Sequence, residues 1–196
     1  MKAVGICGSP RVEGNTEILL RICLNRLEEE GISTDLIRLA EHTIEPCRAC
    51  MQCFKNRDGK CSIRSDDFHP MFEKMRDADI IVVGSPVYFG SATPNLMALL
   101  DRAGYVARAN QQSFSRKLGG PIVVARRAGQ NFTYAQLLMW YMINDMIVPG
   151  SSYWNIAFGR QIGEVEQDEE GRRTVIRFAE NLAWLAHRLS DTSMSS

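Results

Sequence analysis

The stretch ADIIVVGSPVYFG, residues 78–90, joins a continuous apolar run to a loop rich in glycine and proline. Residues 79–83 are predicted to form a strand, because a short run without a polar face is typical of a parallel strand covered on both sides. The loop that follows, GSPVYFGSATPN (84–95), carries Tyr88 and Phe89 beside its glycines and prolines. A loop that its prolines and glycines make stiff, and that presents aromatic rings and free amide groups, is suited to bind a flat heterocycle. The alternative is that these rings pack into the core.

The same alternation of apolar runs and helical patterns extends in both directions from this stretch. Strands are expected at 1–7, 34–39, 121–125 and 151–156, and helices at 15–30, 94–107, 132–147 and near the C-terminus. An exposed turn is expected at 164–170 and a frayed tail after Ser190. Alternating strands and helices predict an α/β fold, a doubly wound parallel sheet with helices on both faces. Five strands suit the flavodoxin-like order 2-1-3-4-5.

The bulk composition narrows the functional class. The 196 residues contain 23 lysines and arginines and 23 aspartates and glutamates, so the net charge favours neither nucleic acid nor a membrane surface. We see no repeat or linker, and we expect residues 1–196 to form a single domain with a cysteine-rich loop at 47–61. The start of the chain lacks a signal peptide pattern and no run is long enough to span a membrane. These features favour a cytoplasmic protein with reduced thiols.

The loop after the first expected strand, GSPRVEGNT (8–16), has the composition of an anion site. Its glycines allow close approach of the backbone, and the next helix points its free amide groups at the same place. The loop lacks the lysine of a Walker A motif and the spacing of a dinucleotide fingerprint. It therefore suits a phosphate monoester, although capped glycine turns of this kind are common. A third loop, ARRAGQN (125–131), again combines glycine with polar donors.

The segment PCRACMQCFKNRDGKC (46–61) contains four cysteines, Cys47, Cys50, Cys53 and Cys61. Disulfides, an iron–sulfur cluster, tetrahedral zinc and a loop of free thiols all remain open for them. The C-x2-C-x2-C spacing with one later cysteine is typical of a single four-iron cluster. The helix expected at 66–76 after this segment is predicted to use Ser65 or Asp66 as its cap.

The motifs GSPRVEGNT, GSPVYFGSATPNLMALLDR and ARRAGQ resemble the flavodoxin-like, NADPH-dependent FMN reductases. With CRACMQCFKNRDGKC and the following DDF, the chain is most similar to the iron–sulfur flavoproteins of that family. The resemblance implies one 4Fe-4S cluster on Cys47, Cys50, Cys53 and Cys61. It also implies FMN, held at its phosphate by Ser9, Arg11, Gly14, Asn15 and Thr16. The isoalloxazine would be bordered by Pro86, Val87, Tyr88, Phe89 and Gly90, with Arg127 and Gly129 beside it.

The resulting hypothesis is a flavin-dependent oxidoreductase in which electrons pass between FMN and one cluster, to or from a carrier such as ferredoxin. No side chain is expected to act as a catalytic acid or base. The first alternative is a clusterless NAD(P)H-dependent FMN or quinone reductase. The second is a zinc-stabilised nucleotide-binding module. FMN is expected and not FAD, because only one anion loop is present. The apolar helix around Trp140 predicts a homo-dimer or homo-tetramer.

Overall fold

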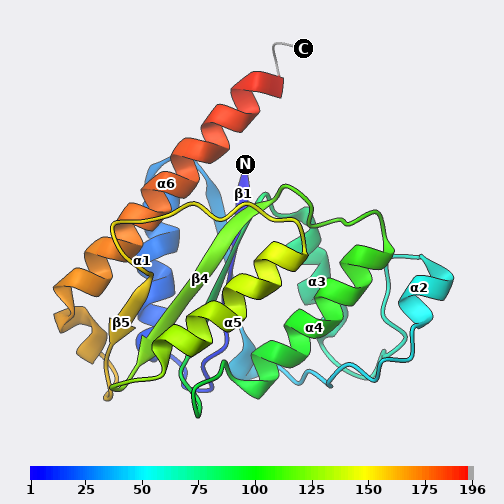
Figure 1. The fold of residues 1–196 in the computed structure, drawn as a ribbon, viewed down its shortest axis with the longest axis horizontal. Helices are drawn as coiled ribbons and strands as arrows, with labels where there is room; N and C mark the ends of the chain where they lie inside the picture. Colours follow the sequence, from blue (N-terminus) through cyan, green and yellow to red (C-terminus); the bar gives the residue numbers. More distant parts are fainter. Residues whose placement is uncertain (194–196) are drawn as a thin grey trace.

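One parallel five-stranded sheet organises the chain (Figure 1). The computed structural model describes residues 1–193, with side chains up to Ser190. Its strand order, β2-β1-β3-β4-β5, confirms the predicted flavodoxin-like topology. The strands are β1 (Lys2–Cys7), β2 (Ser33–Arg38), β3 (Ile80–Pro86), β4 (Leu118–Ala125) and β5 (Ile156–Phe158).

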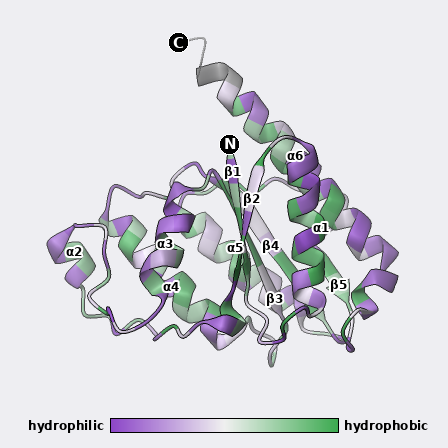
Figure 2. Cartoon of the chain, turned by 180° about the vertical axis from the view of Figure 1, so that it is seen from behind, coloured by the Kyte–Doolittle hydropathy of each residue, from purple (hydrophilic) through white to green (hydrophobic). Residues whose placement is uncertain are grey.

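Helices cover both faces of this sheet. Figure 2 shows the sheet from behind, with α1 and α6 on one side and α3 and α4 on the other. Pro94 occupies the first turn of α4, where the missing N–H of proline costs nothing. The helices are α1 (Asn15–Glu29), α2 (Gln52–Asn56), α3 (Phe68–Asp77), α4 (Pro94–Ala109), α5 (Gln130–Ile143) and α6 (Glu169–Ser193), with short 3-10 turns η1 (Leu39–Glu41) and η2 (Glu164–Gln167).

The central strand β3 is buried on both faces, as its apolar sequence predicts. Ile81 and Val83 belong to the core beneath α3, α4 and α5. Ile80 and Val82 belong to the core beneath α1 and α6. All four side chains are inaccessible to solvent. Removal of that much apolar surface from water is the main stabilising term of the fold, and it holds the loop after β3 at the middle of the sheet edge.

Several predicted boundaries near the C-terminus are wrong. The fifth strand is not at 151–156 but at Ile156–Phe158, because only these three residues pair with 123–125 of β4. The helix expected at 132–147 is α5, which ends at Ile143, and Asp145 takes a positive φ of 58° just beyond it. The expected turn at 164–170 contains η2, whose Val165 is buried. The tail after Ser190 remains helical to Ser193, and its residues 194–196 lie outside the described residues.

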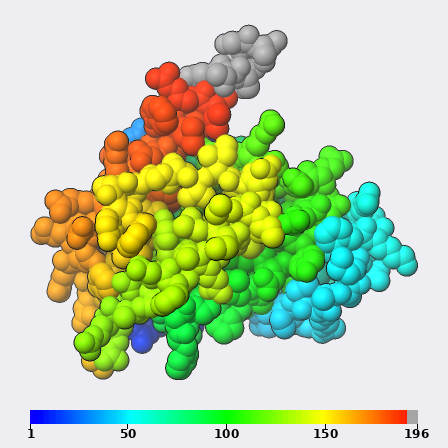
Figure 3. Space-filling model, viewed as in Figure 1, coloured from blue at the N-terminus to red at the C-terminus, as the bar shows by residue number. Residues whose placement is uncertain are grey.

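The cysteine-rich segment forms one end of the molecule. It leaves the sheet after β2, carries the unpredicted short helix α2, and packs against α4 (Figure 3, where the cyan segment adjoins green).

Among the helices that the structure describes, none has the length and apolarity needed to cross a membrane.

Candidate functional site

A cavity of about 340 Å³ opens at the carboxyl ends of the strands. This edge is where ligands bind in open parallel sheets, at the point where the strand order reverses. The loops after β1, β3, β4 and β5 all contribute to it. Its lining comprises Ser9, Pro10, Arg11, Asn15, Thr16, Pro86, Val87, Tyr88, Val124, Arg126, Gly159 and Arg160.

The first loop is a tight turn that leads into α1. The Ser9 hydroxyl accepts a hydrogen bond from the Arg11 backbone N–H at 3.1 Å. A Cβ at Gly14 would lie 3.1 Å from the Arg11 side chain, so a larger residue would crowd the turn. Within the described residues, no side chain caps the start of α1 at Gly14. The first amide groups of α1 are therefore free to meet an anion, as the sequence predicts.

Three arginines give the cavity a positive lining. Arg11 was expected there, whereas Arg126 and Arg160 were not. Arg126 follows the last residue of β4 directly and lines the cavity, while the predicted Arg127 lies outside the lining, although both arginines are exposed. Adjacent residues at a strand end point to opposite sides, so the two arginines could be told apart only by the exact end of β4. The sequence does not indicate Arg160, because the strand of three residues that precedes it carries little periodic signal.

The Asn15 side chain connects α1 to the loop that follows β5. Its oxygen accepts the Gly163 backbone N–H at 2.9 Å, and its amide donates to the Gln161 carbonyl at 2.7 Å. Asn15 is also buried. Its side chain thus positions a wall of the cavity, and its backbone N–H is the part that remains for a ligand.

The loop after β3 forms a tight hairpin that separates its two aromatic residues. Tyr88 and Ser91 exchange backbone hydrogen bonds of 2.8 and 3.0 Å across Phe89 and Gly90, which have φ values of 51° and 81°. Two positive φ values in this position are typical of a type I′ turn. Tyr88 and Phe89 are both exposed, so the alternative of core burial is wrong. Tyr88 lines the cavity, whereas Phe89 and Gly90 lie outside its lining.

Gly129 allows the loop after β4 to pack closely against this hairpin. Its φ of 91° favours glycine, and a Cβ there would lie 2.9 Å from Val87 and 3.4 Å from the Gly90 Cα. Gly129 therefore supports the cavity wall without entering the lining.

The four cysteines of the 47–61 loop line a second cavity, of about 20 Å³, against α4. Its lining shares no residue with that of the first cavity. Three cysteines are partly buried and Cys50 is exposed. In the described part of the chain, no three Cys, His, Asp or Glu side chains gather around a position for one metal ion. The hollow is about the size of one water molecule, so the loop must widen to enclose a larger group.

The backbone around Cys50 has an unusual conformation. Ala49 and Met51, on either side of it, have positive φ values of 49° and 57°. Left-handed residues next to ordinary ones form concavities lined by amide groups, which occur in phosphate and iron–sulfur sites. The Cys50 sulfur lies 3.2 Å from the Ser62 hydroxyl. This hydrogen bond, with contributions from backbone amides and Arg48, lowers the pKa of Cys50, whereas burial raises the pKa of Cys53.

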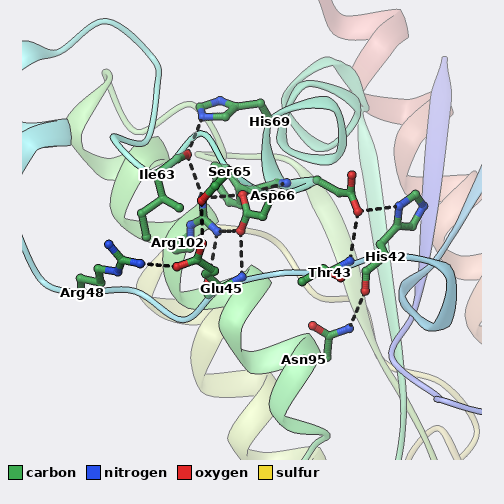
Figure 4. A network of polar contacts seen from close by, with 12 residues as sticks. His42, Thr43, Glu45, Arg48, Ile63, Ser65, Asp66, His69, Asn95 and Arg102 are labelled. Atoms are coloured by element: carbon green, nitrogen blue, oxygen red, sulfur yellow. Dashed lines mark hydrogen bonds and ion pairs between the residues drawn. The ribbon is translucent and has the colours of Figure 1, made fainter.

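A buried ion pair lies beneath the cysteine loop (Figure 4). Arg102 of α4 contacts the Asp66 carboxylate through both terminal nitrogens, and neither side chain is exposed. Asp67 and not Ser65 or Asp66 occupies the cap position of α3, but the Asp66 carboxylate accepts the backbone N–H of Phe68, the first residue of the helix, at 3.4 Å. Ser65 instead donates a hydrogen bond of 2.6 Å to the Glu45 carboxylate. The pair at Asp66 and Arg102 was not foreseen, because it joins positions 36 residues apart.

The fold and the first cavity define a flavodoxin-like protein, and comparison with known sequences specifies the family. Residues 1–161 match the NADPH-dependent FMN reductase family, and the chain belongs to it. The chain is accordingly a flavin-dependent oxidoreductase.

Relatives of similar length narrow this assignment to the iron–sulfur flavoproteins of that family. An iron–sulfur flavoprotein of Methanocaldococcus jannaschii is 38% identical over 190 residues, covering 93% of this chain and 96% of the relative. One from Methanosarcina thermophila is 35% identical, covering 93% of each chain. A solved structure agrees with the fold. The structure of RosB with a bound 8-demethyl-8-formylriboflavin-5'-phosphate intermediate matches this chain with a TM-score of 0.79 at 23% identity. The match covers 98% of this chain and 81% of the RosB chain.

Proposed function

We propose that this protein passes electrons between FMN and one four-iron cluster, and exchanges them with a carrier protein such as ferredoxin. One observation carries the proposal: the four cysteines line a single cavity that is separate from the cavity at the sheet edge. The relatives named iron–sulfur flavoproteins support the same combination.

The cavity at the sheet edge fits FMN. The free amide groups at the start of α1 and the Arg11 side chain are suited to hold the phosphate, and Ser9 and Thr16 lie beside them. Pro86, Val87 and Tyr88 provide the flat, partly apolar wall that an isoalloxazine needs. Bound FMN would supply the electron chemistry, and the protein would orient it and limit its access to water. We propose FMN and not FAD because this cavity has one anion-binding turn.

The cysteine loop fits an iron–sulfur cluster by its donors and its backbone. Four thiols are the usual ligands of a four-iron cluster. A four-iron cluster is larger than a single ion, so its ligands need not converge on one point. The left-handed residues beside Cys50 add amide groups suited to an anionic group. The lowered pKa of Cys50 favours the thiolate that binds iron.

A clusterless NAD(P)H-dependent FMN or quinone reductase is the second candidate. The match of residues 1–161 to the NADPH-dependent FMN reductase family favours it. The zinc-stabilised module is less well supported, because tetrahedral zinc requires ligands around one point and the described residues do not provide such a group.

Purification without oxygen, followed by assay of FMN, FAD, iron, acid-labile sulfide and zinc, separates these candidates. We expect FMN with iron and sulfide in the ratio of one four-iron cluster per chain. FMN without iron or sulfide would favour the clusterless reductase, and zinc without flavin would favour the module. Reduction of the purified protein by NAD(P)H, compared with reduction by a ferredoxin, then identifies the class of electron partner.

A further inference from the structure

Arg102 has a buried nitrogen that lacks a partner next to the cysteine cavity. Its Nε is inaccessible to solvent and, among the described residues, finds no hydrogen-bond acceptor. Arg102 lines the cavity together with the four cysteines. Buried polar groups are nearly always paired in native proteins, so an unpaired N–H in such a position requires an explanation.

The rest of the guanidinium is held firmly in place. One terminal nitrogen contacts the Asp66 carboxylate and donates to the Glu45 carbonyl at 3.0 Å. The other donates to Asp66 at 3.2 Å and to the Ile63 carbonyl at 3.3 Å. The guanidinium carbon lies 4.1 Å from the centre of the Phe68 ring. These contacts fix the plane of the group, so Nε cannot turn toward another acceptor.

The two backbone acceptors lie on either side of the cysteine motif in sequence. Glu45 precedes Cys47 by two positions, and Ile63 follows Cys61 by two. Arg102 therefore clamps both ends of the loop to α4. Such a clamp uses the two terminal nitrogens alone, and leaves the role of Nε unexplained.

Cys61 is the candidate for a partner among the cysteines that line this cavity with Arg102. Cys61 stands two residues before Ile63, whose carbonyl accepts a hydrogen bond of 3.3 Å from Arg102. No hydrogen bond of standard geometry joins Arg102 and Cys61 in the described part of the chain, although the two side chains line the same cavity. Widening of the cavity around a cluster would move Cys61 relative to Arg102, whose guanidinium is held by Asp66 and by the carbonyls of Glu45 and Ile63 at the two ends of the loop.

Resting on the function proposed above, we propose that Arg102 donates a hydrogen bond from Nε to the sulfur of Cys61 when the cluster is bound, and thereby raises the reduction potential of the cluster. Uptake of one electron adds one negative charge to the cluster and its four thiolates, with no bond formed or broken. Hydrogen bonds to the sulfurs and nearby positive charge stabilise that more negative state. Arg102 is a positioning residue for the loop and, through this contact, a determinant of the potential.

The test compares the wild-type protein with Arg102→Lys, which keeps the positive charge and removes the Nε–H. Arg48→Lys is the matched control, because Arg48 lines the same cavity but is exposed. Redox titration with dithionite, followed by electron paramagnetic resonance of the reduced cluster, should give a lower potential for Arg102→Lys and a nearly unchanged one for Arg48→Lys. Iron and sulfide are measured in every sample.

A second measurement does not depend on a variant of Arg102. Wild-type protein made with arginine labelled by ¹⁵N at Nε should show hyperfine coupling between ¹⁵N and the reduced cluster, and Arg48→Lys should retain it. A purely structural clamp would give only a weak through-space coupling, without the isotropic part that a hydrogen bond to a cluster sulfur transmits. A cluster that binds fully but shows no such coupling, or equal potentials for the two variants, would overturn the assignment of Nε. Wild-type protein without iron and sulfide would overturn the proposed function itself, and this inference with it.

Discussion

The side chain of Asn15 accepts a hydrogen bond from the backbone N–H of Gly163 at 2.9 Å, joining positions 148 residues apart. Its amide also donates to the Gln161 carbonyl, so one side chain connects the start of α1 to the loop after β5. That loop contributes Gly159 and Arg160 to the cavity at the sheet edge. The phosphate end of the proposed FMN site therefore depends on contacts between two distant parts of the chain.

We expect Asn15→Ala to lower both stability and FMN affinity. Loss of this side chain leaves the partly buried Gly163 N–H and Gln161 carbonyl and the buried Val165 N–H without this partner, at a cost of about 1–3 kcal/mol. Urea unfolding measures the stability, and quenching of FMN fluorescence measures the affinity. Asn181→Ala is the control, because it removes an exposed hydrogen bond to Gly150 far from the cavity. Equal effects of the two variants on FMN binding would contradict the role given to Asn15.

The backbone conformation of Phe89 is expected to destabilise the fold slightly, whereas the ring of Tyr88 is expected to contact FMN in the cavity. A bulky residue with φ of 51° is strained, and asparagine tolerates this conformation better. Phe89→Asn should therefore raise the free energy of unfolding by about 1 kcal/mol.

Tyr88→Ala should weaken FMN binding by about tenfold, the loss of an aromatic contact of about 1.4 kcal/mol. If Phe89→Asn weakened FMN binding as much as Tyr88→Ala, the ring of Phe89 would cover the flavin, as the family resemblance implies.

Glu17 makes stability depend on pH. Burial alone raises the pKa of this carboxyl, but hydrogen bonds from Arg38, Arg21 and the Glu13 backbone hold it below its usual range. A folded-state pKa below the unfolded value contributes stability above the unfolded pKa, and this contribution is lost as the pH falls through the folded value. Glu17→Gln should thus cost about 1–3 kcal/mol at pH 7, and the difference should shrink in acid.

Urea unfolding of both proteins from pH 7 down to pH 3 checks this dependence. Glu29→Gln provides the comparison, because its ion pair with Arg26 is exposed and surface pairs contribute little. A gap between wild type and Glu17→Gln that stayed constant across this range would show that the carboxyl charge is not responsible.

Replacement of Cys50 tests whether FMN binding is independent of the cysteine cavity. Cys50→Ser should lose most of the iron and the broad brown absorbance while FMN remains bound, because the two linings share no residue. Exchange of electrons with a one-electron carrier should fall sharply, and reduction of the flavin by NAD(P)H should be less affected. Cys23→Ala is the control, since Cys23 is fully buried between α1 and the sheet. Loss of FMN from Cys50→Ser would mean that the two sites are coupled.

The exposed side of α5 is expected to mediate self-association. Met139, Met142 and Ile143 are each more than 60% exposed, although Trp140 and Tyr141 beside them are buried. Contiguous exposed apolar side chains are typical of subunit interfaces. Light scattering at micromolar concentration should show a dimer or tetramer, and Met142→Glu should shift it toward monomer. Trp184→Glu, which changes an exposed apolar residue on α6, should have no such effect. A monomeric wild type would refute the prediction.

The sequence by itself determined the sheet and the placement of its loops. The apolar run of β3, the turn GSPRVEGNT and the spacing of the four cysteines are local patterns, and local patterns follow from periodicity and backbone preference within a few positions. They were sufficient to predict the strand order, and together with the family resemblance they selected seven of the twelve residues that line the first cavity. These local patterns predicted the structure least well near β5, because a strand of three residues leaves little periodic signal.

Only the tertiary structure decided which side chains meet. The choice of Arg126 over Arg127 depends on the residue at which β4 ends, because the next side chain points to the other side. The pairing of Asp66 with Arg102 depends on how α4 packs beneath the cysteine loop. The attachment of Asn15 to Gly163 depends on where the last strand joins the sheet. Each of these contacts joins distant positions through side-chain direction and packing, which no short stretch of sequence contains.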